Sequence, residues 1–180
     1  VETSIIPTTW REGGLAVYGG TESGLKWNAG LTTGFNLANW DPSSNDGRDS
    51  PLGSIHQELS LAAAKDLSGY LSLNYVGIPG WTFGGTYFTG KAGQGVQDFP
   101  AQNARVTLWE GHVRWQPGPF DFAALYSRAT ISDTEALNLT FIGQPTPVPQ
   151  LFYGGYVQGA WRNIWQYNDY ALTPFTRYEW

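Results

Sequence analysis

A histidine between two charged residues is the best candidate for chemistry in this sequence. Glu110, His112 and Arg114 are spaced two residues apart, so in an extended strand their side chains project from one face. In an enzyme, His112 would act as a general base that Glu110 orients. In a wall that faces water, the three residues would form a charge ladder in which Glu110 and Arg114 compensate each other. Because no positioned nucleophile or G-x-S-x-G turn accompanies them, we favour the charge ladder and expect no catalytic residue and no enzyme.

The other motifs with chemical potential are incomplete. Segment 85–91 resembles a phosphate-binding loop, but Ala92 follows it where a Ser or Thr hydroxyl would be needed for magnesium. His56 and His112 are far apart in the sequence, the chain has no cysteine, and the acidic stretch 41–49 lacks the spacing of a calcium loop. We therefore expect no metal site and no cofactor.

The elements that must position these residues are strands. Apolar and polar residues alternate with period two, which is typical of strands whose faces meet different surroundings. About eight strands are expected, and the alternation is clearest in 25–33, 67–75, 81–87, 109–115 and 120–127, with weaker versions in 151–161 and 171–180. Residues 57–65 interrupt the alternation, and there we expect a short helix or a helical loop.

The connections between these strands are short and long in turn. Tight turns rich in Gly and Pro occupy 21–24, 77–80 and 116–119, long polar stretches occupy 36–54, 91–104 and 129–149, and a longer connection on the short side occupies 162–170. A soluble meander has no reason to keep its short turns at one end. An outer-membrane barrel does, because its periplasmic turns are short and its external loops are long.

The two faces of these strands differ in charge. Charges within the strands fall on the less apolar face, where we expect a water-filled pore. Its expected lining comprises Lys26, Asn28, Ser72, Asn74, Glu110, His112, Arg114, Asp121, Arg177 and Glu179. Arg11 and Glu12 either brace the wall or line the constriction, and the sequence pattern does not separate these roles.

Aromatic residues gather near the predicted turns, as in the girdles of membrane barrels. Those close to the short turns are Tyr18, Trp27, Tyr75, Trp81, Trp115, Phe120 and Trp161. Those expected nearer the other rim are Phe35, Tyr87, Tyr126 and Tyr153. Together they predict two aromatic belts that border an apolar band.

Composition restricts the classes of function. Aromatic residues make up 16% of the 180 residues and glycine occurs 23 times, whereas charged residues reach only 14%, against roughly 25% in a typical domain. The net charge of −5 argues against binding nucleic acid. The sequence has no apolar run of about 18 residues that would form a transmembrane helix. Val1 is not followed by a signal segment, so an exported protein would be seen here as a processed chain or an excerpt.

Several segments resemble the outer-membrane porin families that include the phosphate-selective porins. They are 5–19, 75–80, 89–95 and 173–179, and they sample most of the chain. The resemblance implies a barrel of about sixteen strands, of which this chain would be a part, and a homotrimer. The alternation that ends in Tyr178 and Trp180 resembles a terminal assembly signal, which would suit a complete small barrel instead. The chain departs from the anion-selective members in having only three lysines and a net negative charge.

The sequence as a whole predicts an all-β, antiparallel transmembrane β-barrel or a fragment of one, as a single unit over 1–180. We expect a porin of the bacterial outer membrane, with lipid as its surroundings and small hydrophilic solutes or ions as its cargo. The alternative is a soluble carbohydrate-binding β-sandwich or barrel that stacks sugars on exposed Trp residues. The first expectation requires the apolar face of the strands to be exposed rather than buried in a protein interior.

Overall fold

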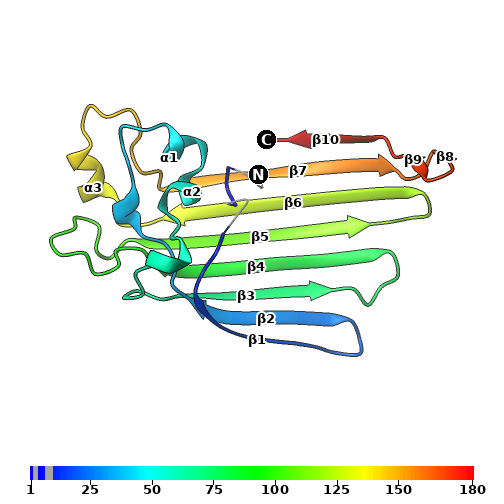
Figure 1. Ribbon diagram of the computed structural model, residues 1–180, viewed down its shortest axis with the longest axis horizontal. Coiled ribbons are helices and arrows are strands. Elements are labelled where there is room, and N and C mark those ends of the chain that lie inside the picture. The colour runs from blue at the N-terminus through cyan, green and yellow to red at the C-terminus, as the bar shows by residue number, and fades with distance from the viewer. Residues whose placement is uncertain (2–3, 7–9) are drawn as a thin grey trace.

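The computed structural model describes residue 1, residues 4–6 and residues 10–180. An antiparallel sheet of eight strands, in the order β1-β2-β3-β4-β5-β6-β7-β10, dominates the chain (Figure 1). The strands are β1 (Gly14–Gly20), β2 (Leu25–Thr32), β3 (Ser68–Tyr75), β4 (Trp81–Lys91), β5 (Arg105–Trp115), β6 (Phe120–Ile131), β7 (Leu151–Trp161) and β10 (Phe175–Glu179). The all-β class and the antiparallel order are therefore confirmed.

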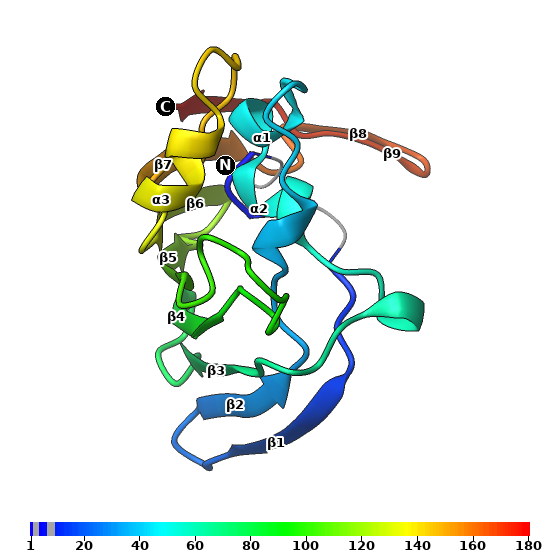
Figure 2. The same ribbon diagram turned by 90° about the vertical axis from the view of Figure 1, so that its left-hand side faces the viewer.

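The sheet is strongly curled but it is not closed. Figure 2, which views the strands nearly end-on, shows them as an arc whose hollow side holds the N-terminal segment and the helices. The strands β1 and β10 form the two edges, and no hydrogen-bonded ladder joins them within the described residues. We call the hollow side the concave face and the other side the convex face.

The short connections all lie at one end of the sheet and the long ones at the other, as expected (Figure 1). Each of the first three short turns contains a glycine with a positive φ, namely Gly24 (95°), Gly80 (78°) and Gly118 (58°). The fourth carries a hairpin of β8 (Trp165–Tyr167) and β9 (Tyr170–Leu172).

The long connections carry the helices. These are η1 (Leu37–Asn39), α1 (Asp46–Asp49), α2 (Pro51–Ile55) and η2 (Leu59–Leu61) between β2 and β3, and α3 (Glu135–Thr140) between β6 and β7. In the described part of the chain, no helix is long and apolar enough to cross a membrane.

Of the short helix or helical loop expected over 57–65, the structure has the loop, with a single helical turn, η2. The side-chain amide of Gln57 donates to the carbonyl oxygens of Gly34 (2.9 Å) and Ala63 (3.1 Å), and its oxygen accepts from the backbone N–H of Ala63 (2.8 Å). These bonds engage the peptide groups that a helix would need. The α-helices of this connection instead lie just before it.

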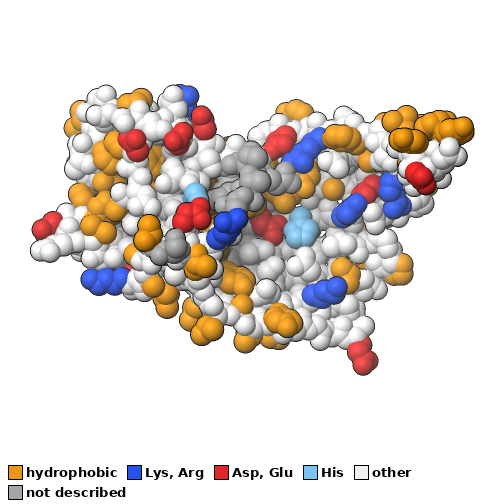
Figure 3. Space-filling view, in the orientation of Figure 1, with side chains coloured by type: hydrophobic (Ala, Val, Ile, Leu, Met, Phe, Trp, Pro, Cys, Tyr) orange, Lys and Arg blue, Asp and Glu red, His pale blue; other side chains and the backbone are white. Residues whose placement is uncertain are grey.

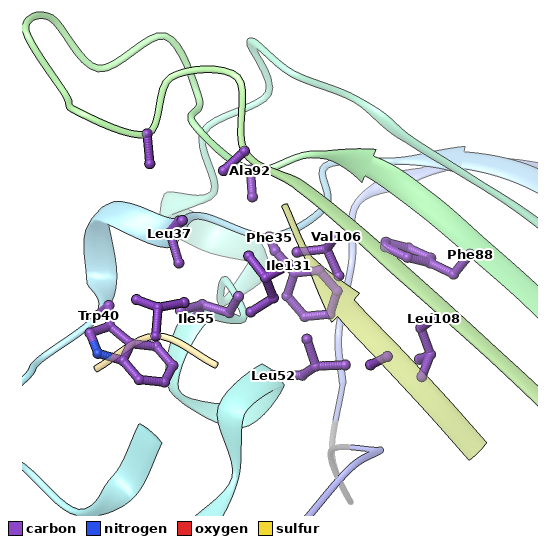
Figure 4. Close-up of a cluster of buried hydrophobic side chains, with 14 of the residues drawn as sticks. Phe35, Leu37, Trp40, Leu52, Ile55, Phe88, Ala92, Val106, Leu108 and Ile131 are labelled. Carbon is purple, nitrogen blue, oxygen red and sulfur yellow. The ribbon is translucent and has the colours of Figure 1, made fainter. Parts of the chain in front are cut away.

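The hydrophobic core lies on the concave face, next to the long connections. Phe35, Leu52 and Ile55, from the β2–β3 connection, are almost completely buried against Val106 and Ile131 of β5 and β6 (Figure 4). The loop therefore folds back onto the inner wall of the sheet. Phe35 belongs to this core and not to a rim belt, which corrects the expectation from the sequence.

Candidate functional site

The convex face is almost entirely apolar and exposed. Its residues form rows across the sheet, because every strand pair is in register; one row runs through Trp27, Leu73, Gly85, Gly111 and Tyr126. Many of its large side chains leave much of their surface uncovered, from 36% for Trp27 to 86% for Leu15, whereas others such as Trp81 and Tyr126 are half-buried. Soluble monomers rarely expose a continuous apolar patch of more than a few hundred Å². This face therefore requires a nonaqueous surrounding or a partner.

An aromatic row borders the convex face near the short turns. The ring centroids of Trp81 and Trp115 are 5.2 Å apart, those of Trp115 and Phe122 are 5.6 Å apart, and those of Phe120 and Trp161 are 5.4 Å apart. Tyr18, expected in this belt, lies on the opposite face instead. Its register partner is Asn28, a concave-face residue, so the alternation of β1 turns the ring of Tyr18 inward.

A second aromatic group borders the convex face toward the long connections. Tyr87 pairs with Trp109 across β4 and β5, and the ring of Tyr126 lies 5.4 Å from that of Trp109 and 6.3 Å from that of Tyr153. The two groups thus lie toward opposite ends of the same strands. The separation into two belts is incomplete, because Trp27, expected near the short turns, and Tyr126, expected nearer the other rim, lie in the same middle row.

All ten residues expected to line a pore lie on the concave face. They occupy four successive rows in the half of the sheet near the short turns. Toward the short turns, the first row contains Asn28, Ser72 and Glu110, and the second contains Lys26, Asn74, His112 and Glu179. The third contains Arg114 and Arg177, and the row nearest the short turns contains Asp121. Figure 3 shows charged side chains gathered over this half of the face.

Their contacts differ from those expected. The Oε2 atom of Glu110 lies 2.9 Å from Nδ1 of His112, whose Nε2 lies 3.2 Å from Oδ1 of Asn74. Arg114 does not compensate Glu110. Its guanidinium makes a two-pronged ion pair with Asp121, donating through Nε at 2.8 Å and through Nη2. The reason is register: the residue opposite Arg114 is Ala123, which has no acceptor, and Asp121 is its diagonal neighbour.

The last charged pair stabilises the C-terminal edge strand. The Nε atom of Arg177 lies 3.1 Å from Oε2 of Glu179, and the guanidinium stacks 3.6 Å above the ring of Tyr156 on β7. Glu179 also accepts from the N-terminal ammonium group of Val1. These contacts bring the chain start to the concave side of β10.

Ile6, Trp10 and Glu12 of the N-terminal segment line an open pocket on the concave face of the sheet. Glu12 accepts hydrogen bonds from Nε1 of Trp10 (2.7 Å), from Oγ1 of Thr33 (2.6 Å) and from the backbone N–H of Gly34. These bonds tie the N-terminal segment to the end of β2, and Glu12 also lines the pocket beside it. The pocket has a volume of about 620 Å³, and Trp10, Tyr70, Phe88, Glu110 and His112 are among its lining residues.

The charges are less completely segregated than the sequence indicated. Lys91, Arg105 and Arg128 lie on the convex face near the long connections. Arg128 follows Tyr126 by two residues and therefore projects from the same face of β6. The sequence would have placed it there if the strand had been expected to continue to Ile131. Asp66 lies in the loop before β3.

The acidic stretch 41–49 is organised by its own hydrogen bonds. The Oδ1 atom of Asp41 accepts from the backbone N–H (2.9 Å) and the hydroxyl (2.6 Å) of Ser43, and these bonds lower the pKa of Asp41. Among the described residues, no group of three or more His, Asp or Glu side chains is placed to hold a metal ion.

The fold defines the chain as an all-β protein built on one curled antiparallel sheet. No protein-family model matches the sequence, and no solved structure matches it. An uncharacterized protein of Aquifex aeolicus (strain VF5) is 26% identical over 140 residues, which cover 77% of this chain and 30% of that protein. The chain thus spans less than a third of the length of this relative. Residues 7–9 of the porin-like segment 5–19 lie outside the described residues.

Proposed function

We propose that this chain is part of an outer-membrane porin-type β-barrel that forms a water-filled diffusion channel for small hydrophilic solutes or ions. The observation that carries the proposal is the difference between the two faces. On the convex face, the middle rows of the strands are apolar, glycine or aromatic and are exposed. On the concave face, the corresponding rows contain charges and amides. Membrane barrels alternate in this way, apolar toward lipid and polar toward the lumen.

The open edges support a barrel larger than this sheet. A lipid-exposed edge strand would leave backbone N–H and C=O groups without partners, which costs several kcal/mol for each group in hydrocarbon. Further strands beside β1 and β10 would satisfy these groups and close the wall. The greater length of the Aquifex relative leaves room for such strands. We propose about sixteen strands and a homotrimer, in line with the porin resemblance.

The concave face favours weak charge selectivity. The lumen-facing set contains three permanent cations, Lys26, Arg114 and Arg177, and three carboxylates, Glu110, Asp121 and Glu179. Most of these charges are paired with one another, so no uniform field of one sign would select anions. The loop core at the other end narrows the lumen. The channel that we propose therefore admits small solutes and discriminates them mainly by size.

Conductance in planar bilayers tests the proposal. The full-length protein, purified in detergent, should insert and produce discrete conductance steps that scale with bulk salt, and its migration in gels should change on heating. No cofactor and no substrate turnover are required. If the protein stays monodisperse without detergent and adds no conductance to the bilayer, the porin proposal is wrong.

The Arg114–Asp121 pair provides a sharper prediction. The variant Arg114→Ala leaves Asp121 without its cation, so the lumen gains negative character, and Asp121→Asn does the opposite. Since a unit charge at about 4–8 Å contributes about 0.5–1 kcal/mol in water, the cation-to-anion permeability ratio should change roughly two- to sixfold, in opposite directions. Reversal potentials in a salt gradient measure this ratio. Arg48→Ala, in an exposed loop, is the control, and equal ratios in all variants would remove the pair from the solute path.

A soluble carbohydrate-binding protein is the second candidate. Its supporting observation is the row of half-buried Trp81 and exposed Trp115 and Phe122, whose rings are nearly parallel, at 20° and 27°. Sugars stack on such surfaces. Retention on a sugar column by detergent-free protein, lost on Trp115→Ala, would favour this candidate over the porin.

A further inference from the structure

Three cations lie on the convex face toward the long connections, two of them at its margin and the third two rows further in. Lys91 and Arg105 are register partners across β4 and β5, and Arg128 on β6 lies between Trp109 and Tyr153. All three side chains are exposed. Among the described strand residues of this face, no Asp or Glu is present. We call Lys91, Arg105 and Arg128 the basic rim.

The basic rim has neutral partners only. Nζ of Lys91 donates to Oδ1 of Asn103 at 3.3 Å, and Nη1 of Arg105 donates to Oγ1 of Thr89 at 3.4 Å. Oγ1 of Thr89 in turn lies 3.1 Å from that of Thr107. No ion pair of the described residues includes a member of the rim. Cations and hydroxyl groups are thus available to an external anion.

The depth of the rim matches a membrane boundary. The pairs Trp81–Trp115 and Lys91–Arg105 stand ten residues apart on the same two strands. At about 3.4 Å per residue and a tilt of about 40°, they are separated by about 26 Å along the membrane normal, close to the thickness of the apolar band of such barrels. Arg128 shares a row with Tyr87 and Trp109, four residues from the Lys91–Arg105 pair, so it lies about 10 Å deeper along the membrane normal. From there its long side chain would have to extend toward the headgroups.

The two margins of the convex face differ in charge. The margin at the short turns ends in Trp81, Trp115 and Trp161 without any cation, whereas the margin at the long connections carries the basic rim. A partner that covers the whole face must therefore be apolar in its middle and anionic on one side only. A bilayer with an anionic outer leaflet has this distribution.

We propose that the basic rim binds the phosphate groups of a phosphorylated glycolipid in the outer leaflet. This inference rests on the proposed function. Guanidinium groups offer paired N–H donors that match phosphate oxygens, and the lysine adds a point charge. The apolar rows below the rim contact the acyl chains of the same lipid. The loop carboxylate Asp133, held by the hydroxyl of Ser132 at 3.1 Å, limits the site on the loop side.

Lipid retention tests the proposal. The full-length protein and the variant K91Q/R105Q/R128Q are incubated in detergent with a phosphorylated glycolipid or with the same glycolipid after phosphatase treatment, and bound lipid is counted by native mass spectrometry. The wild type should prefer the phosphorylated form. Each cation removed should weaken binding about fivefold, and the triple variant on the order of a hundredfold. R48Q removes a loop cation and should bind as the wild type does.

A separate measurement distinguishes failure of this inference from failure of the proposed function. Both the wild type and the triple variant should float with vesicles of neutral phosphatidylcholine, because flotation requires only the apolar face. If the protein floats but retains both glycolipid forms equally, the proposal that the basic rim binds phosphate is wrong, and the proposed function is unaffected. If the wild type does not float, the proposed function fails and this inference fails with it.

Discussion

Gly111→Arg should destabilise the membrane-inserted protein by about 2–4 kcal/mol, the cost of an arginine near the bilayer midplane. Gly111 lies in the middle of β5 on the convex face, opposite Gly85 and Tyr126. A Cβ atom added there meets nothing within 4 Å, so the substitution causes no steric clash. The penalty would therefore come from the surroundings of the face rather than from packing. Urea unfolding of protein folded into vesicles, monitored by the heat-dependent gel shift, measures it.

Gly111→Leu is the control, because it adds an uncharged apolar side chain in the same open space. It should fold at least as well as the wild type, since glycine in a strand contributes neither side-chain contacts nor conformational restriction. In a soluble protein the arginine would be the tolerated change and the leucine the aggregation-prone one. Equal stability of Gly111→Arg and the wild type in vesicles would contradict a lipid-facing convex face.

Phe35→Ala should release the β2–β3 connection from the concave wall, at a cost of about 3–5 kcal/mol. The ring of Phe35 is 1% exposed and lies 4.8 Å from that of Trp10 and 5.4 Å from that of Phe88, centroid to centroid. It thus joins the loop, the N-terminal segment and the sheet. Loss of about 3 kcal/mol of local stability increases the opened population, and with it the rate of tryptic cleavage after Arg48, roughly a hundredfold.

The control for this experiment lies in the same connection. Leu61 is 93% exposed, so Leu61→Ala removes a similar amount of apolar side chain without loss of packing and should leave the cleavage rate unchanged. The sheet itself should persist in both variants, as judged by circular dichroism. Cleavage of Phe35→Ala at the wild-type rate would show that the core does not hold the loop against the wall.

The sheet was predictable from the sequence because its signals are local. Alternation in β3 or β5 assigns each residue to a face, and turn glycines such as Gly80 and Gly118 mark where the chain reverses. These features assign Asn74, His112 and Glu179 to one face, and the pairing of the strands then brings them into one row. The ten expected pore residues share a face for the same reason.

The loop core was not predictable by that route. Phe35, Leu52 and Ile55 follow no period, and they are buried through contacts with strands more than fifty residues away in sequence. The partners of the charged residues were equally hidden. Whether Arg114 pairs with Glu110 on its own strand or with Asp121 on the next depends on cross-strand register, which one strand's pattern does not contain.

The basic rim was not predictable from the sequence either, because its residues lie near the ends of their strands. The sequence pattern places a residue on a face only within the bounds assigned to its strand, and β4, β5 and β6 extend further toward the long connections than the clear alternation does. Arg128 therefore fell outside the strand expected over 120–127. Strand ends near long loops are where alternation becomes weak, and they are also where a membrane barrel would meet headgroups.

Spin labels along β5 test the central claim most directly, because the chain has no cysteine and each introduced one is unique. Labels at 109, 111 and 113 should be accessible to oxygen, which dissolves in hydrocarbon, and protected from a water-soluble nickel complex when the protein is in vesicles. Labels at 110, 112 and 114 should show the reverse. Accessibility to the nickel complex at 109, 111 and 113, with no excess of oxygen collisions there, would contradict a barrel wall between lipid and water.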